Sequence, residues 1–295
     1  GWRIWIVRSL PILAILPVTC IWLLVSFNSV PEARGETVWL IGANRLIEFL
    51  PALVSSPPSF IGQLVGLLFL AIPWIAGARP KRSMLAWAPL GLYIVWMLCV
   101  PHALGGNAFT YQRFGLFGLP LYFLCFESAG VANKRYQRLA GIGIALIAVS
   151  FVGWHSVRAL VFDAEVRGYQ VVMERAEPGK RMLMLAFNRM SQSSNAPLHM
   201  HTAGWYQAES GGLAEFSFAR FWGMPIRYKN GSPSEIYPNF EWVPGTLDWE
   251  RHKGSLYDYF LVRHPLDAAD WMSEKSENTV QLLARSGEWQ LYGKK

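Results

Sequence analysis

The sequence predicts an α-helical polytopic membrane bundle followed by a small extracytoplasmic α/β domain, and its charge distribution is the first support for this fold class. Only 16% of the 295 residues are charged, whereas a typical soluble domain has about 25%. The deficit lies in residues 1–158, which contain four acidic and 12 basic residues, while residues 159–295 contain 16 acidic and 15 basic residues. Long apolar runs fill the first part, and shorter apolar segments alternate with polar ones in the second. We therefore predict a transmembrane domain over 1–158 and an extracytoplasmic α/β domain over 159–295.

Five apolar runs approach the ~20 residues that a helix needs to cross a bilayer. They are residues 4–26, 59–77, 84–100, 113–131 and 139–157. The short segments at 78–82 and 133–138 are basic, which predicts a cytoplasmic location for both. The loops at 27–58 and 101–112, and the chain after the last run, are then expected on the outer face of a bacterial inner (cell) membrane.

The first outer loop contains a segment with helical periodicity. Residues 37–56 place apolar side chains such as Leu46 and Phe49 on one side, with Asn44, Arg45 and Glu48 on the other. This pattern predicts an amphipathic helix that lies on the membrane surface.

The second half predicts a small sheet covered by helices. The apolar runs at 180–187 and 256–264 predict buried strands, and residues 279–295 predict a β-hairpin that turns at Ser286-Gly287. Helices are expected at 163–179, 198–212 and 265–275. Residues 214–222 fit a strand or an extended segment, and 223–247 fit a loop.

The candidate substrate-binding residues lie in the predicted outer loops. Arg113, with Tyr111 and Gln112 beside it, stands at the outer mouth of the fourth apolar run. A guanidinium with neighbouring hydroxyl and amide groups can grip a phosphate, although an arginine that simply reaches the interface gives the same pattern. His102 lies in the same loop, where it either assists a substrate hydroxyl or faces water.

Arg45 and Glu48 of the first outer loop are the remaining candidates. Their spacing of three on a helix permits an ion pair, and we expect either a substrate entrance or a solvated helix face there. No catalytic residue is identified among these positions.

Other motif classes are not supported. The net positive charge belongs to the hydrophobic half, so no nucleic-acid partner is expected. Cys20, Cys99 and Cys125 all lie in apolar runs and fit packing positions. His199 and His201 form an H-x-H pair that could begin a metal site if it lay on a strand, but no further ligands follow at metal spacing. No cofactor is evident from the sequence, and a divalent metal is left open.

This layout resembles the GT-C type of bacterial membrane glycosyltransferase, the superfamily that includes protein mannosyltransferases and aminoarabinose transferases. The resemblance is carried by the consecutive apolar runs, the amphipathic outer segment, Arg113-Phe114 at the start of a late run, and the outer α/β domain that ends in "YDYFLVRH" and "VQLLARSGEWQLYGKK". It implies transfer of a sugar from a polyprenyl-phosphate donor to an acceptor on the outer face, with membrane lipid and a polyprenyl-phosphate-linked sugar as partners.

In that superfamily the acidic catalytic residue stands in the first outer loop of the full-length protein, close to its N-terminus, and the resemblance places no part of that loop within the present chain. The chain opens "GWRIWIVRSL", without an initiator Met, and on this basis we expect a C-terminal piece whose catalytic residue lies upstream. Two alternatives remain open at this point. One is a non-catalytic, membrane-anchored protein for glycan binding, assembly or sensing. The other is a transporter, which the scarcity of ionisable groups inside the apolar runs disfavours.

Overall fold

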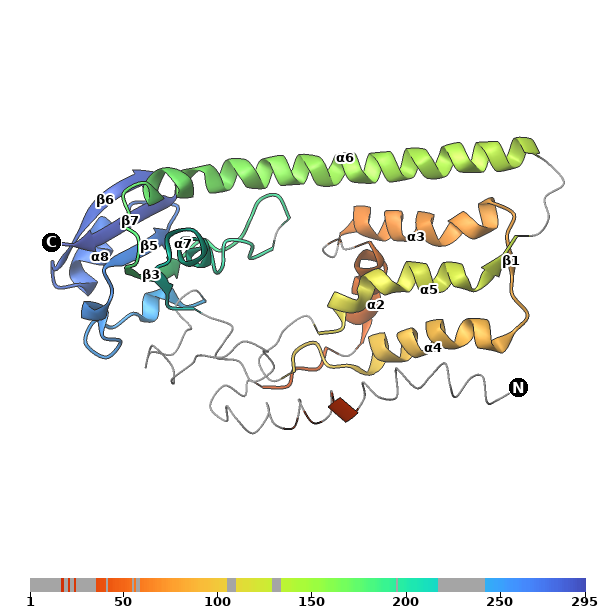
Figure 1. Ribbon diagram of the computed structural model, residues 1–295, viewed down its shortest axis with the longest axis horizontal. Coiled ribbons are helices and arrows are strands. Elements are labelled where there is room, and N and C mark those ends of the chain that lie inside the picture. The colour runs from red at the N-terminus through yellow and green to blue at the C-terminus, as the bar shows by residue number, and fades with distance from the viewer. Residues whose placement is uncertain are drawn as a thin grey trace. The chain divides into compact units, whose positions relative to one another are not determined.

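The computed structural model shows two compact units (Figure 1). It describes residues 17–18, 21, 24, 36–40, 42–54, 56, 59–104, 110–128, 134–194, 196–216 and 242–295. The first unit contains the described residues of Gly1–Trp74 and Ala78–Ala129. The second contains Ile75–Gly77 and the described residues of Gly130–Ser217 and Ser234–Lys295. Most of the predicted run at 4–26 and most of the predicted loop at 223–247 lie outside the described residues.

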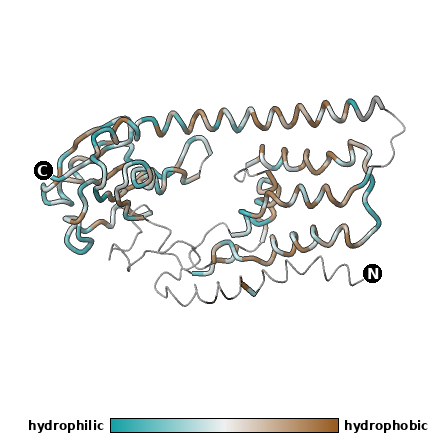
Figure 2. The backbone as a smooth tube through the Cα atoms, in the orientation of Figure 1, coloured by the Kyte–Doolittle hydropathy of each residue, from teal (hydrophilic) through white to brown (hydrophobic). Residues whose placement is uncertain are grey.

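The first unit consists of short helices joined by turns and one small strand pair. In chain order its elements are α2 (Ala43–Leu53), α3 (Phe60–Ile75), β1 (Arg79–Pro80), α4 (Met84–Cys99), the 3-10 helix η2 (Gln112–Phe117), α5 (Gly118–Leu124) and β2 (Phe126–Glu127). Figure 2 shows hydrophobic residues along α3, α4 and α5, and hydrophilic residues in the turn between α3 and α4.

The predicted polytopic membrane bundle is wrong. Among the described residues, only one helix, at Arg138–Met173, is long and apolar enough to cross a membrane. Helices α3 and α4 have 16 residues each, about 24 Å of helix, whereas the hydrocarbon core is roughly 30 Å thick. The predicted span at 113–131 divides into η2, the seven-residue α5 and strand β2. Hydropathy reports apolar composition and does not show where a helix ends: α3 and α5 end shortly before strands β1 and β2, which pair with each other.

The amphipathic helix predicted at 37–56 forms as α2, although it is shorter than expected. Two glycines let the backbone of the 112–124 segment approach this helix closely. A Cβ at Gly115 would meet the carbonyl oxygen of Ala52 at 2.3 Å, and one at Gly118 would meet Leu53 Cδ2 at 2.3 Å. Because real Cβ contacts are never so short, this close packing requires glycine at both positions.

Helix α6 (Lys134–Met173) opens the second unit and contains the predicted run at 139–157. Its last turns pack on strands β6 (Val280–Ser286) and β7 (Trp289–Lys294). A Cβ at Gly168 would lie 2.5 Å from the carbonyl oxygen of Ser286. One helix therefore carries an exposed apolar stretch at its start and a packed stretch at its end.

A five-stranded mixed sheet forms the centre of the second unit, in the order β4-β3-β5-β7-β6. Strands β3 (Arg181–Ala186), β4 (Leu213–Ala214) and β5 (Tyr259–Arg263) are parallel, and β7 and β6 are antiparallel to their neighbours. The predicted strands at 180–187 and 256–264 are confirmed as β3 and β5. The predicted hairpin is confirmed as β6 and β7, with Gly287 at a positive φ of 59° in the turn.

Both faces of this sheet are covered, which explains why β3 and β5 are continuous apolar runs. Met182 and Met184 face one core cluster with residues of α6 and of α7 (Ala203–Ser210). Leu183 and Leu185 face a second cluster that includes Met272 of α8 (Ala269–Lys275). Helices α7 and α8 confirm the predicted helices at 198–212 and 265–275. Two 3-10 helices, η4 (Pro244–Thr246) and η5 (Gly254–Leu256), precede β5.

Candidate functional site

Five of the six candidate substrate-binding residues meet in the first unit, and we call them the polar cluster: Arg45, Glu48, His102, Tyr111 and Gln112. Arg45 and Glu48 lie on α2, Tyr111 and Gln112 lie at the start of η2, and His102 follows α4. The connecting segments are held together by a two-way backbone pairing of Val38 with Ala103. This pairing and the packing of η2 on α2 bring residues more than 60 positions apart into contact.

Glu48 is the centre of the hydrogen bonding in the polar cluster. The Tyr111 hydroxyl donates to Glu48 Oε2 at 2.5 Å, and Gln112 Nε2 donates to the same oxygen at 2.9 Å. Gln112 Nε2 also lies 2.8 Å from His102 Nδ1. Because an amide nitrogen only donates, His102 Nδ1 is the acceptor, and the neutral ring carries its proton on Nε2. Glu48 Oε1 makes no hydrogen bond among the described residues and is available to a ligand donor.

Tyr111 is fully buried, and its environment keeps the phenol protonated. Burial raises the pKa of Tyr111 above its usual value, and the hydrogen bond and negative charge of Glu48 raise this pKa further. The positive charge of Arg45 acts in the opposite direction. Tyr111 is therefore a neutral donor that fixes one oxygen of the Glu48 carboxylate.

Arg45 is buried at the edge of the polar cluster, with 6% of its surface exposed. Its guanidinium lies 4.3 Å from the centre of the Tyr111 ring and donates to the backbone carbonyls of Leu40 and Val100. The ion pair with Glu48 that the spacing permits does not form among the described residues. Arg45 Nε is buried without a hydrogen-bond partner there, so the cation keeps both an unneutralised charge and an unused donor.

An open cavity of about 470 Å³ adjoins Arg45. Apart from Arg45, the residues that line the cavity are apolar: Trp39, Gly42, Leu46, Leu98 and Cys99. The volume falls within the roughly 300–1,000 Å³ of small-molecule sites. An apolar wall beside one buried cation suits an amphiphile with an anionic head group.

Arg113, the residue first expected to grip a phosphate, is exposed. It makes no hydrogen bond and no ion pair with any residue that the structure describes. Its neighbour in the same run, Asn107, lies outside the described residues. The structure therefore places Arg45, rather than Arg113, in the polar cluster and beside the cavity.

The two histidines of the H-x-H pair contact different partners. His199 Nε2 lies 2.6 Å from Glu165 Oε2, and the His201 ring stacks on Phe216 at 3.8 Å. Within the described parts of the chain, no group of three or more His, Cys, Asp or Glu side chains lies close enough to hold a metal ion.

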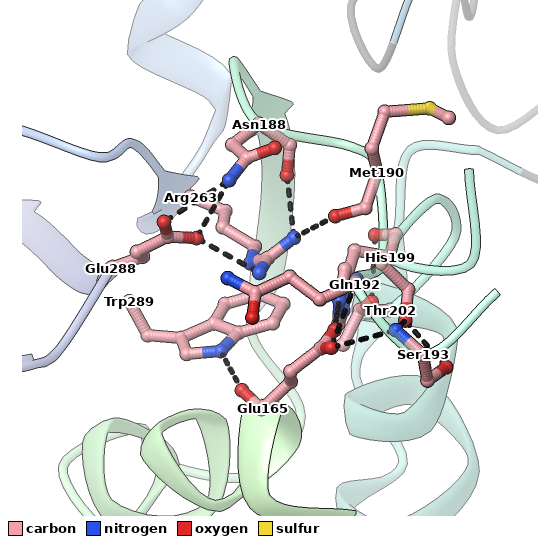
Figure 3. Close-up of polar contacts among 11 residues, drawn as sticks. Glu165, Asn188, Met190, Gln192, Ser193, His199, Thr202, Arg263, Glu288 and Trp289 are labelled. Atoms are coloured by element: carbon pink, nitrogen blue, oxygen red, sulfur yellow. Dashed lines mark hydrogen bonds and ion pairs between the residues drawn. The ribbon is translucent and has the colours of Figure 1, made fainter. Parts of the chain in front are cut away.

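A second polar network, which the sequence did not predict, lies at the carboxyl ends of β3 and β5 (Figure 3). Arg263 is 4% exposed; it donates to the Asn188 carbonyl at 2.7 Å and pairs with Glu288 at 2.8 Å. Trp289 Nε1 donates to the Glu165 carbonyl at 2.9 Å. The sequence shows only an arginine at the end of a predicted buried strand, and nothing in the sequence identifies the residues that this arginine contacts. Its contacts join residues 188–193 and His199 to α6 and the sheet.

Comparison with known proteins found no match for this chain among protein-family models, curated proteins or solved structures.

Proposed function

We propose that the chain binds a polyprenyl-phosphate-linked sugar at the outer surface of a bacterial cell membrane and transfers the sugar to an acceptor there. The observation that supports this proposal is the buried Arg45 guanidinium, which joins the apolar cavity to the polar cluster. A polyprenyl-phosphate sugar has three parts in the same order: an apolar chain to match the cavity, a phosphate to match Arg45, and a hydroxyl-rich sugar to match the polar cluster.

The phosphate would bind at Arg45. The arginine has no carboxylate partner among the described residues, and its buried Nε lacks an acceptor. A buried unpaired cation is costly, and a phosphate oxygen would supply both the charge and the acceptor that are missing. During transfer, an acceptor hydroxyl oxygen forms a bond to the anomeric carbon and gives up its proton to a base, while the sugar–phosphate C–O bond breaks and its electron pair stays on the phosphate oxygen. A cation beside that oxygen stabilises the charge that develops.

The sugar would bind at the other side of the polar cluster. Glu48 Oε1 is an available acceptor, and the buried Gln112 Oε1 has no partner among the described residues. Sugar hydroxyls donate to such oxygens. Tyr111 and Gln112 hold Glu48 in place before the ligand arrives, which lowers the entropic cost of binding.

Alkylation of Cys99 tests this proposal, because Cys99 is exposed and lines the cavity. In a Cys20→Ser background, the rate of maleimide labelling is measured with polyprenyl phosphate or with uncharged polyprenol. We expect the phosphate lipid to slow Cys99 labelling, polyprenol to have little effect, and Arg45→Gln to lose the protection. Buried Cys125 is the internal control for unfolding.

Two matched variants make the result specific. Arg167→Gln removes an exposed arginine from the second unit and should leave protection unchanged. Arg113→Gln decides between the two arginines: loss of protection there, with Arg45→Gln unaffected, would overturn the assignment to Arg45. Lipid binding without sugar transfer in membranes containing the chain would support the non-catalytic alternative.

A further inference from the structure

The end of the first unit opposite the polar cluster combines arginines with aromatic side chains. The α3–α4 turn carries Arg79, Lys81 and Arg82, which we call the basic turn. It is a fixed structure: β1 pairs with β2, Lys81 N donates to the Cys125 carbonyl at 2.8 Å, and Lys81 Nζ donates to the Leu124 carbonyl at 3.0 Å.

An aromatic group supports the basic turn from the helix side. The Phe126 ring lies 5.2 Å from Trp74, 5.0 Å from Tyr122 and 6.1 Å from Trp87. Both indole nitrogens are satisfied, since Trp74 donates to the Tyr122 hydroxyl and Trp87 donates to the Lys81 carbonyl, each at 2.9 Å. Indole rings with one polar edge and one apolar body are typical of the head-group level of a bilayer.

The two arginines of the basic turn have no ion-pair partner among the residues that the structure describes. Arg79 and Arg82 are exposed, and neither forms an ion pair with a described carboxylate, including Glu127, which stands opposite Arg79 in the β1–β2 pair. Apolar side chains flank these cations: Met84 is 88% exposed and Leu85 is 68% exposed. Exposed arginines beside exposed apolar side chains at the start of α4 suit the surface of a bilayer, where anionic head groups cover an apolar interior.

We propose that the basic turn binds the anionic head groups of a phospholipid leaflet, with Arg79 and Arg82 as the head-group contacts and Trp74 and Trp87 at the level of the interface. The charge complementarity selects anionic over zwitterionic lipid. This surface is separate from the polyprenyl-phosphate site, because it shares no residue with the polar cluster or the cavity.

The test is a titration of the purified chain with phosphatidylglycerol or phosphatidylcholine in mixed micelles, followed by native mass spectrometry. We expect tighter binding of phosphatidylglycerol, a loss of about tenfold or more for Arg79→Gln/Arg82→Gln, and weaker binding at high salt. Arg79→Lys/Arg82→Lys should retain most of the preference. Arg167→Gln/Arg251→Gln, which removes two exposed arginines from the second unit, should leave it unchanged.

Equal affinity for the two lipids, or wild-type affinity in the Gln/Gln variant, would overturn the proposal. The salt dependence of the wild-type chain decides the question even if the Gln/Gln variant fails to fold. Arg45→Gln should bind phosphatidylglycerol normally, so failure at the basic turn and failure at the polyprenyl-phosphate site are distinguishable.

Discussion

At the scale of single residues, burial determines the protonation and hydrogen bonding of the His199 ring. The side chain is fully buried, its Nε2 lies 2.6 Å from Glu165 Oε2, and its Nδ1 has no partner among the described residues. Burial lowers the pKa of His199, and the nearby Arg263 charge lowers it further, against the opposing effects of Glu165 and Glu288. The neutral ring therefore donates to the Glu165 carboxylate, which makes this pair a structural contact between α6 and the 188–199 segment.

This contact makes the second unit sensitive to acid. The unfolded chain protonates His199 at about pH 6.5, but the folded chain resists protonation, so the unfolded state binds more protons below that pH. Stability is then full above about pH 6.5 and falls as the pH drops towards the lowered folded-state pKa. Thermal unfolding of the chain between pH 7.5 and 5 should show this fall. His199→Gln should flatten the pH dependence while lowering stability at pH 7.5 by about 1–3 kcal/mol; an unchanged slope in the variant contradicts the assignment.

At the scale of elements, close approach through glycine holds α2 against η2 and so assembles the polar cluster. Gly115→Val places side-chain atoms where the Ala52 carbonyl already lies, and overpacking of this kind costs about 1–3 kcal/mol. We expect a lower unfolding temperature together with faster labelling of Cys125, which is buried in the same unit.

Gly91→Ala is the matched control in α4, because nothing lies within 4 Å of a Cβ at this position. It should stabilise the helix by about 0.5–1 kcal/mol, through helix propensity alone. If Gly91→Ala and Gly115→Val change stability equally, close packing at Gly115 is not what holds these elements together.

The elements also show what local sequence can predict. Strands β3 and β5 are apolar on both faces and bounded by charged residues, and Gly287 marks the hairpin turn, so residues 180–187, 256–264 and 279–295 are predicted correctly. The prediction of a span at 113–131 is wrong because this run divides into η2, α5 and β2. The close approach of Gly115 and Gly118 to α2 involves residues that no local window contains. Five of the six site residues named from the sequence lie together in the polar cluster. Local sequence does not show that Arg45 is buried beside the cavity, because the cluster brings together residues far apart in the chain, such as Glu48 and Tyr111.

At the scale of the whole molecule, the two units differ in the kinds of site that they contain. The first unit has the apolar cavity with the buried Arg45 at one end of its short helices and the basic turn at the other. The second unit contains an α/β domain that packs on the last turns of α6, and the polar network described there is formed by its own side chains. The proposed function therefore concerns the first unit, while α6 is the one described helix of membrane-crossing length.

The most direct test of this account is the equilibrium affinity of the purified chain for polyprenyl phosphate compared with polyprenol of the same length, with wild type and Arg45→Gln measured side by side. The account predicts that polyprenyl phosphate binds more tightly than polyprenol, by about tenfold or more. It also predicts that Arg45→Gln removes this preference, because the buried guanidinium is its source. Equal affinity for the two lipids, or a preference that survives in Arg45→Gln, would contradict it.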